Sequence, residues 1–156
     1  VSQGYWGDEQ STRERFRRNP LQYSNIPRDD IVVYTGDYGY MDEEGFLYFI
    51  GRKDEMIKSA GNRISPTEVE EIVYNSGLVS DAVAFGIPHE IYGQSVCLVV
   101  SPAASTSVNP DILLKYCREK MPAYMVPSRI EFLESLPRNA NGKIDRPAIK
   151  KMFSGK

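Results

Sequence analysis

Residues that bind metals or form disulfides are scarce in this chain. Its 156 residues include one histidine, His89, and two cysteines, Cys97 and Cys117. The cysteines lie twenty positions apart without a CxxC pair, and His89 completes no familiar metal-ligand spacing with them. We therefore expect no metal site in these residues. We also expect two reduced, packed thiols rather than a disulfide, which is typical of a cytoplasmic protein.

Long apolar segments are also missing. The sequence contains no run of about 18 apolar residues, so we expect no membrane-spanning helix. The first ten residues, VSQGYWGDEQ, have neither a basic leader nor an apolar core, so we expect no signal peptide. The missing initial methionine suggests a piece of a longer protein.

Positive charge is concentrated near one end of the chain. The whole sequence has a net charge of −2, but residues 138–156 contain six lysines and arginines against Asp145 alone, a local charge of +5. Such a segment favours phosphate or nucleic acid. Because Phe153 is its one aromatic residue, base stacking is poorly supported and we do not expect nucleic-acid binding.

The first third of the chain predicts too little structure to fold alone. Asp8 can cap a short helix, and a loop containing Pro and Asp follows over 19–30. Segments 31–34 and 46–50 have the composition of strands, and MDEEG between them resembles the polar tip of a hairpin. We predict that residues 1–51 are the last strip of a larger preceding domain.

The remaining residues, 52–156, predict a small α+β domain. Ser65, Pro66 and Glu68 satisfy the rules for an N-cap, a first-turn proline and a capping box, so a helix is expected to begin there. Asn109 opens a second helix. The apolar positions expected on its buried side are Ile112, Leu113, Tyr116 and Cys117. The order expected from residue 55 is β-α-β-β-α-β-α, which allows for a short first strand at the apolar step of Met56 and Ile57. The strands of the sheet are expected at 82–87, 95–100 and 130–133, with a loop at 103–107. This order predicts helices packed on a three-stranded sheet.

The sequence NANGKIDR at 139–146 combines a turn with a helix start. Asn141 and Gly142 both tolerate positive φ, and Asp145 can cap a short helix that follows. Lys143 is therefore expected at the rim of a tight turn. Such a lysine is either directed at an anion or is simply solvated, which is the common state of lysine.

Three motifs occur in fixed order: YTGD at 34–37, GRKDEMIKSAGNRISPTEVE at 51–70 and NGKIDR at 141–146. Together they closely resemble the C-terminal region of adenylate-forming enzymes, which include acyl-CoA synthetases, peptide-synthetase adenylation domains and luciferases. The resemblance covers essentially the whole chain and is closest to the AMP-forming acyl-CoA ligases. It implies that residues 52–156 form a mobile C-terminal lid and residues 1–51 the end of the large domain.

The resemblance also implies roles for individual residues. Lys143 matches the lysine that contacts the carboxylate and phosphate where acyl-adenylate forms, and its charge would stabilise the transition state. Asp37 matches the aspartate that accepts hydrogen bonds from the ribose hydroxyls of ATP, and Arg52 matches an arginine that reaches the nucleotide.

Four further positions follow from the second motif. Asp54 matches the hinge about which the lid swings. Gly61 matches the loop that lines the pantetheine tunnel, where a side chain would crowd the thiol arm. Arg63 resembles a position that contacts a CoA phosphate, and Lys58 is a further basic candidate for the same ligand.

The implied parent enzyme is an acid–thiol ligase. It forms acyl-AMP and pyrophosphate from a carboxylic acid and ATP, and a thiol then displaces AMP to give a thioester. The expected cofactors are ATP/AMP, CoA and Mg²⁺, and the partners are the large N-terminal domain and CoA or a phosphopantetheinyl carrier protein. Because the phosphate loop, acyl pocket and magnesium ligand of the family lie upstream, we expect the fragment alone to be inactive.

Two alternatives remain open. One alternative is the lid of an adenylation domain that loads a carrier protein, although Arg63 and the lack of a following carrier domain favour CoA. A different class is a non-catalytic module whose basic tail docks a carrier protein or an acidic partner.

Overall fold

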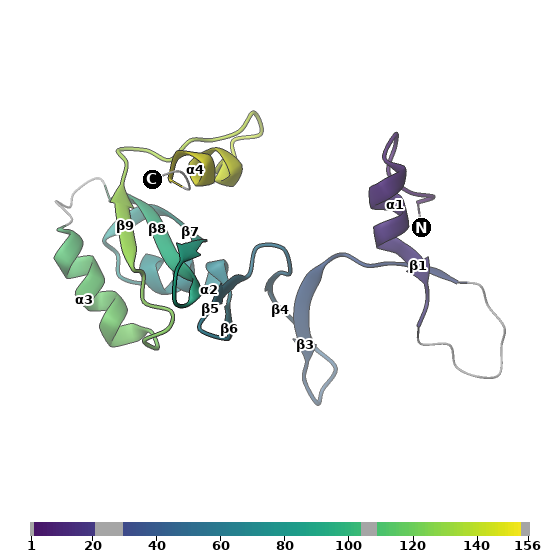
Figure 1. The fold of residues 1–156 in the computed structure, drawn as a ribbon, viewed down its shortest axis with the longest axis horizontal. Helices are drawn as coiled ribbons and strands as arrows, with labels where there is room; N and C mark the ends of the chain where they lie inside the picture. The colour runs from purple at the N-terminus through teal and green to yellow at the C-terminus, as the bar shows by residue number, and fades with distance from the viewer. Residues whose placement is uncertain (1, 21–29, 104–108, 154–156) are drawn as a thin grey trace. The chain divides into compact units, whose positions relative to one another are not determined.

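The computed structural model describes residues 2–20, 30–103 and 109–153. These residues divide into two compact units, Val1–Phe49 and Ile50–Lys156 (Figure 1). Most of the loops expected at 19–30 and 103–107 lies outside the described residues. None of the described helices is long and apolar enough to cross a membrane. The assignment of the two units as the end of a large domain and a mobile lid stays a prediction.

The first unit begins with α1 (Glu9–Arg15), which is capped as expected. The Asp8 carboxylate accepts a hydrogen bond from the Ser11 amide at 2.9 Å. The chain then continues into β1 (Phe16–Arg18), which pairs antiparallel with β2 (Ile31–Val33).

The hairpin predicted between segments 31–34 and 46–50 is wrong. Instead β3 (Asp37–Met41) pairs with β4 (Leu47–Arg52) around the MDEEG tip. The Asp42 carboxylate closes this tip by accepting from the amides of Glu44 and Phe46, at 3.0 and 2.8 Å. The tip was recognised, but its first strand was missed because DYGYM begins with Asp and contains Gly, which are rare in strands.

The second unit is built on one sheet. Its strands are β5 (Ile57–Ser59), β6 (Asn62–Ile64), β7 (Val79–His89), β8 (Gly93–Pro102) and β9 (Arg129–Phe132). They follow the order β6-β5-β8-β7, with β9 parallel to β8. The α+β class is confirmed, but the sheet has five strands rather than three. The two additional strands, β5 and β6, form a short hairpin around SAGN. β5 begins at the short apolar step where the sequence allowed for a first strand, whereas β6 lies where only a break in regularity was expected.

Helices cover both faces of this sheet. Apolar residues of α2 (Pro66–Tyr74) and α3 (Pro110–Lys120) pack with Ala82, Ala84 and Leu98 on one face. Ile149 of α4 (Arg146–Phe153) packs with alternate residues of β7 and β8 on the other. Figure 1 shows α3 and α4 on opposite sides of the strands.

Two details of the predicted helices are wrong. Ser65 makes no side-chain capping bond, because its hydroxyl donates to the Ile50 carbonyl at 2.7 Å, so no capping box with Glu68 forms. Ile112 is 55% exposed, although Leu113 and Cys117 are fully buried as expected. The cysteines are free and buried, in separate clusters on the two faces of the sheet.

Candidate functional site

The predicted turn before Lys143 is confirmed, and Asn139 builds it. Gly142 has φ +77°, and its amide donates to the Asn139 carbonyl at 2.9 Å. The Asn139 side-chain oxygen accepts from the amides of Asn141 and Lys143, at 3.0 and 3.1 Å. The Lys143 side chain is exposed at the rim. Sequence reasoning missed Asn139, although an Asn that bonds the backbone two residues later is a known turn signal.

The turn leads directly into α4, and two sets of side-chain hydrogen bonds fix the start of this helix. Asp145 caps it as predicted, by accepting from the Ala148 amide at 3.0 Å. The guanidinium of Arg146 donates to both carboxylate oxygens of Glu70 on α2, at 2.8 and 2.5 Å. Glu70 is buried and also accepts from the Ala84 amide at 2.7 Å. The hydrogen bonds that Arg146 donates to Glu70 raise the pKa of Arg146 above its ordinary value.

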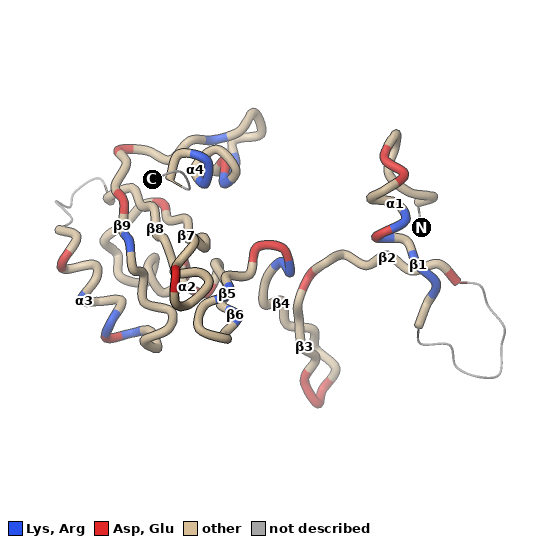
Figure 2. The backbone as a smooth tube through the Cα atoms, in the orientation of Figure 1, with Lys and Arg blue, Asp and Glu red and all other residues tan. Residues whose placement is uncertain are grey.

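The basic character of this segment is smaller than its sequence suggests. Figure 2 shows the Lys and Arg positions along α4 and the segment before it. Arg146 is neutralised by Glu70, and Arg138 is paired with Asp81 on β7 at 2.9 Å. The lysines, including Lys143, therefore carry most of its outward charge.

The predicted nucleotide and hinge residues contact each other. Arg52 Nε lies 3.3 Å from a carboxylate oxygen of Asp54, and the Arg52 side chain is half-buried whereas that of Asp54 is exposed. The amides of Glu55 and Met56 both donate to the Arg52 carbonyl at 3.2 Å, which makes 52–56 a tight turn. The structure thus brings these two predicted residues together.

The three predicted thiol-side residues share one hairpin. Lys58 on β5 is directly opposite Arg63 on β6, and both are exposed. Ala60 and Gly61 connect the strands with φ of +48° and +80°, as a type I′ turn requires. A Cβ added to Gly61 would meet no atom within 4 Å. Its glycine is therefore explained locally by the turn.

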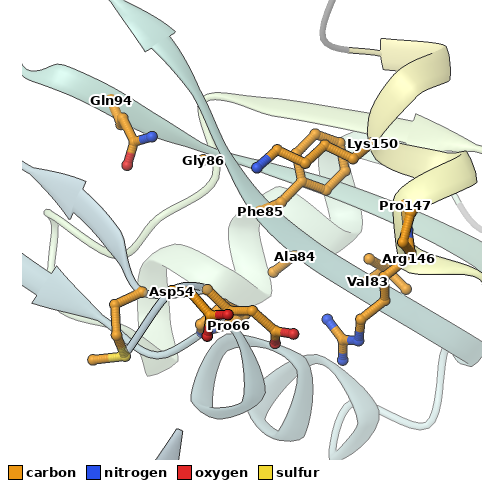
Figure 3. A pocket seen from close by; sticks show the side chains of 12 residues that line it. Asp54, Pro66, Val83, Ala84, Phe85, Gly86, Gln94, Arg146, Pro147 and Lys150 are labelled. Carbon is orange, nitrogen blue, oxygen red and sulfur yellow. The ribbon is translucent and has the colours of Figure 1, made fainter. Parts of the chain in front are cut away.

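The second unit contains a cavity beside α4 and another beside the β5–β6 turn. One of about 280 Å³ is lined by Asp54, Phe85, Gln94, Arg146 and Lys150, among others, and Figure 3 shows Lys150 reaching from α4 across Phe85. The other, of about 310 Å³, adjoins the β5–β6 turn. Its lining includes Ala60, Tyr92 and Tyr124, and the His89 ring, which stacks on Tyr92 at a centroid distance of 4.6 Å.

Asp37 lies in the first unit, at the exposed start of β3. Its amide donates to the Thr35 hydroxyl at 3.2 Å, and Arg15 donates to the Thr35 carbonyl at 2.9 Å. Arg15 therefore braces the YTGD loop, a contact that sequence reasoning missed. Within the described ranges, no group of three or more His, Cys, Asp or Glu residues could hold a metal ion.

Comparison with known proteins adds independent information. Residues 68–143 match the family described as the AMP-binding enzyme C-terminal domain. Oxalate–CoA ligase of Arabidopsis thaliana is 38% identical over 120 residues, 77% of this chain and 23% of that protein. The 2-succinylbenzoate–CoA ligase of Bacillus mycoides is 36% identical over 152 residues, 97% of this chain and 29% of that protein.

A solved structure agrees with these relatives. The o-succinylbenzoate CoA synthetase of Bacillus subtilis, in complex with its acyl-adenylate intermediate, matches with a TM-score of 0.80 and 29% identity. The match covers 100% of this chain and 29% of that chain.

The fold and these matches define the C-terminal part of an adenylate-forming enzyme. The chain belongs to this family, as its three motifs predicted. It spans between 23% and 29% of the length of the curated relatives described here.

Proposed function

We propose that this chain is the C-terminal part of an AMP-forming acid–thiol ligase that makes acyl-CoA. The observation that carries the proposal is the Lys143 turn, in which an exposed lysine follows a backbone fixed by Asn139 and precedes a capped helix. A cation held in this way is suited to stabilise charge that develops on a ligand. The CoA-ligase relatives support this class of reaction.

In the first half-reaction, a carboxylate oxygen attacks the α-phosphorus of ATP. The bond from that phosphorus to the bridging oxygen breaks, and pyrophosphate leaves with the electron pair. Negative charge accumulates on the phosphoryl oxygens, where Lys143 would stabilise it. Asp37 would accept from the ribose hydroxyls and Arg52 would reach the nucleotide. The solved relative in complex with an acyl-adenylate supports this half of the proposal.

In the second half-reaction, the thiol sulfur attacks the acyl carbonyl, the bond from that carbon to the AMP phosphate oxygen breaks, AMP leaves with the electron pair, and the thiol proton is released to solvent. Asp54 would be the hinge of the rotation that replaces Lys143 with the Gly61 turn. Arg63 and Lys58 would contact CoA phosphates, which agrees with their exposed positions opposite each other on β5 and β6. A phosphopantetheinyl carrier protein is the second candidate acceptor.

Magnesium would accompany ATP, but the described residues contain no donor set that fits it. As the family resemblance implies, its ligands, like the phosphate loop and acyl pocket, would lie in the remainder of the parent enzyme. A cytoplasmic location is part of the same proposal, since both thiols are free and lie on opposite faces of the sheet.

Parallel assays of the two half-reactions test the proposal in the full-length parent enzyme. Lys143→Ala should lower acid-dependent pyrophosphate exchange by roughly two orders of magnitude or more, as expected for loss of a positioned transition-state donor. Thioester formation from supplied acyl-AMP should change little. Lys151→Ala, which removes another exposed lysine of the same segment, is the matched control.

Equal losses in both half-reactions would mean that Lys143 is structural. The present chain alone should give no exchange, and exchange above background would contradict its assignment as a fragment. Asp37→Ala should raise the KM for ATP in the same assay.

A further inference from the structure

The tip of the Lys143 turn lacks apolar support. All of its residues from Asn139 to Lys143 are exposed, whereas the nearest buried apolar residues, Leu136 and Ile149, lie outside it. The Asn139 bonds fix the shape of the turn, but they lie within it and do not fix its place on the domain. Ile144, directly after the turn, packs partly buried against the cluster that contains Val83 and Phe85, so it holds the end of the turn but not its exposed tip. A contact from the tip to the sheet is needed to fix the tip as well.

Arg138 supplies this contact. One nitrogen of its guanidinium donates to the Asp81 carboxylate on β7 at 2.9 Å. Another donates to the Gly142 carbonyl at 3.1 Å. Gly142 immediately precedes Lys143, so one planar, rigid group joins the sheet to the residue beside the proposed catalytic lysine. Lysine lacks such a fork, so it cannot reproduce this geometry.

A second ion pair sets the base of the same segment. Arg146 and Glu70 fix the first turn of α4, three residues beyond Lys143. This pair is buried on the Glu70 side, so its loss would disturb the fold as a whole. Arg138 and Asp81 are more exposed, at 51% and 22% of their side chains, and exposed ion pairs contribute little to stability. The Arg138–Asp81 pair can therefore be removed with little loss of stability, so its effect on catalysis can be measured separately from folding.

We propose that Arg138 and Asp81 are positioning residues that hold Lys143 at the adenylation site through the hydrogen bond from Arg138 to the Gly142 carbonyl. This inference rests on the proposed role of Lys143. Neither residue touches the reactants. They act by keeping the turn at a fixed place on β7 when the lid presents it to the acid and ATP.

The test uses the full-length parent enzyme with Arg138→Met, Arg138→Lys, Asp81→Ala and Lys143→Ala. Arg138→Met should lower kcat for pyrophosphate exchange by about tenfold to a hundredfold, the range expected for a misplaced catalytic group. The KM for ATP, the melting temperature and thioester formation from supplied acyl-AMP should stay close to those of the unaltered enzyme. Arg138→Lys should be intermediate. Glu131→Ala, which removes a partly exposed pair with Arg129 on β9, is the matched control and should leave pyrophosphate exchange unchanged.

A charge-reversed double variant separates positioning from simple ion pairing. Asp81→Arg combined with Arg138→Asp restores attraction between the two positions, but an aspartate at 138 cannot donate to the Gly142 carbonyl. We expect the rate of pyrophosphate exchange to stay low in this double variant. In the unaltered 156-residue chain, the amide of Lys143 should also exchange hydrogen more slowly than in the Arg138→Met chain.

Three results would overturn the inference. Full exchange activity in Arg138→Met, while Lys143→Ala is inactive, would reject positioning and leave the proposed function intact. Full recovery in the charge-reversed variant would show that the ion pair alone suffices. Full exchange activity in Lys143→Ala would reject the proposed role of Lys143 itself, and the inference with it.

Discussion

Arg146 and Glu70 are separated by 76 positions in the sequence, yet they share two hydrogen bonds. The same carboxylate accepts from the Ala84 amide, so Glu70 joins α2, α4 and β7 at one point. Because Glu70 is almost fully buried, this contact is both a structural link and a source of vulnerability.

Glu70→Ala should destabilise the chain strongly. The change leaves the Ala84 amide without its acceptor and the half-buried Arg146 without its partner carboxylate, which together should cost about 2 to 4 kcal/mol of unfolding free energy. Urea unfolding of the 156-residue chain measures this cost. Glu71→Ala, at the exposed neighbouring position on α2, is the control and should change stability little. Equal effects of the two substitutions would contradict the structural role of Glu70.

The two buried thiols should make stability fall in alkaline solution. Burial raises the pKa of Cys97 and of Cys117 to about 11, from an ordinary value of 9.0. The folded state therefore keeps protons that the unfolded state releases, and this contribution to stability is present below about pH 9 and is lost as the pH approaches about 11.

Unfolding free energies across this pH range provide the measurement. A chain with both Cys97→Ala and Cys117→Ala should be less stable overall, because of the cavities it creates, but its stability should fall less steeply between the two pKa values. Identical slopes in the two chains would show that the thiols do not contribute. Alkylation of both thiols should be slow until the chain unfolds.

The proposed thiol side of the lid can be tested at Gly61. Gly61→Asn adds a side chain but tolerates the positive φ of the turn, so it separates bulk from backbone strain. In the full-length parent enzyme it should slow thioester formation while leaving pyrophosphate exchange nearly unchanged. Gly77→Asn is the matched control, because Gly77 has φ +68° and equally open surroundings. Equal slowing of both half-reactions by Gly61→Asn would argue for a general structural effect.

The proposed hinge can be tested at Asp54. Asp54→Pro fixes φ near −65°, whereas a hinge must change its dihedral angles, so it should slow one half-reaction by about tenfold or more relative to the other. Asp54→Ala is the control, since it removes the ion pair with Arg52 but leaves the backbone free. If the proline and alanine variants behave alike in both half-reactions, Asp54 is not the hinge.

Local signals in the sequence were reliable where the partner is also local. Asp8, Asn109 and Asp145 each cap a helix through an amide two or three residues later, and all three caps were predicted. Ser65 satisfied the same rules, but its hydroxyl donates to the Ile50 carbonyl, fifteen residues earlier in the chain. The predicted capping box does not form, because the Ser65 side chain bonds an acceptor that is distant in the sequence.

Partners far apart in the sequence could not be predicted. Phe16–Arg18 pairs with Ile31–Val33 across a long connection, and nothing in either segment specifies the other. Similarly, Glu70 is one of three glutamates in EVEE, and only the position of Arg146 shows which of them is buried. The motifs identified Lys143 through resemblance, but the two arginines that hold its turn became visible only in the structure.

The two-sided covering of the sheet has a consequence for synthesis of the domain. Residues 138–153 leave the ribosome after α2, β7 and β8, so Glu70 and Asp81 are synthesised before their arginine partners. Until α4 arrives, Val83, Phe85 and Val99 present an apolar face to solvent, which favours aggregation or chaperone binding. The segment that covers this face also carries Lys143. An unfinished domain therefore lacks its proposed catalytic lysine, and burial of the face and delivery of the lysine are completed by the same last segment.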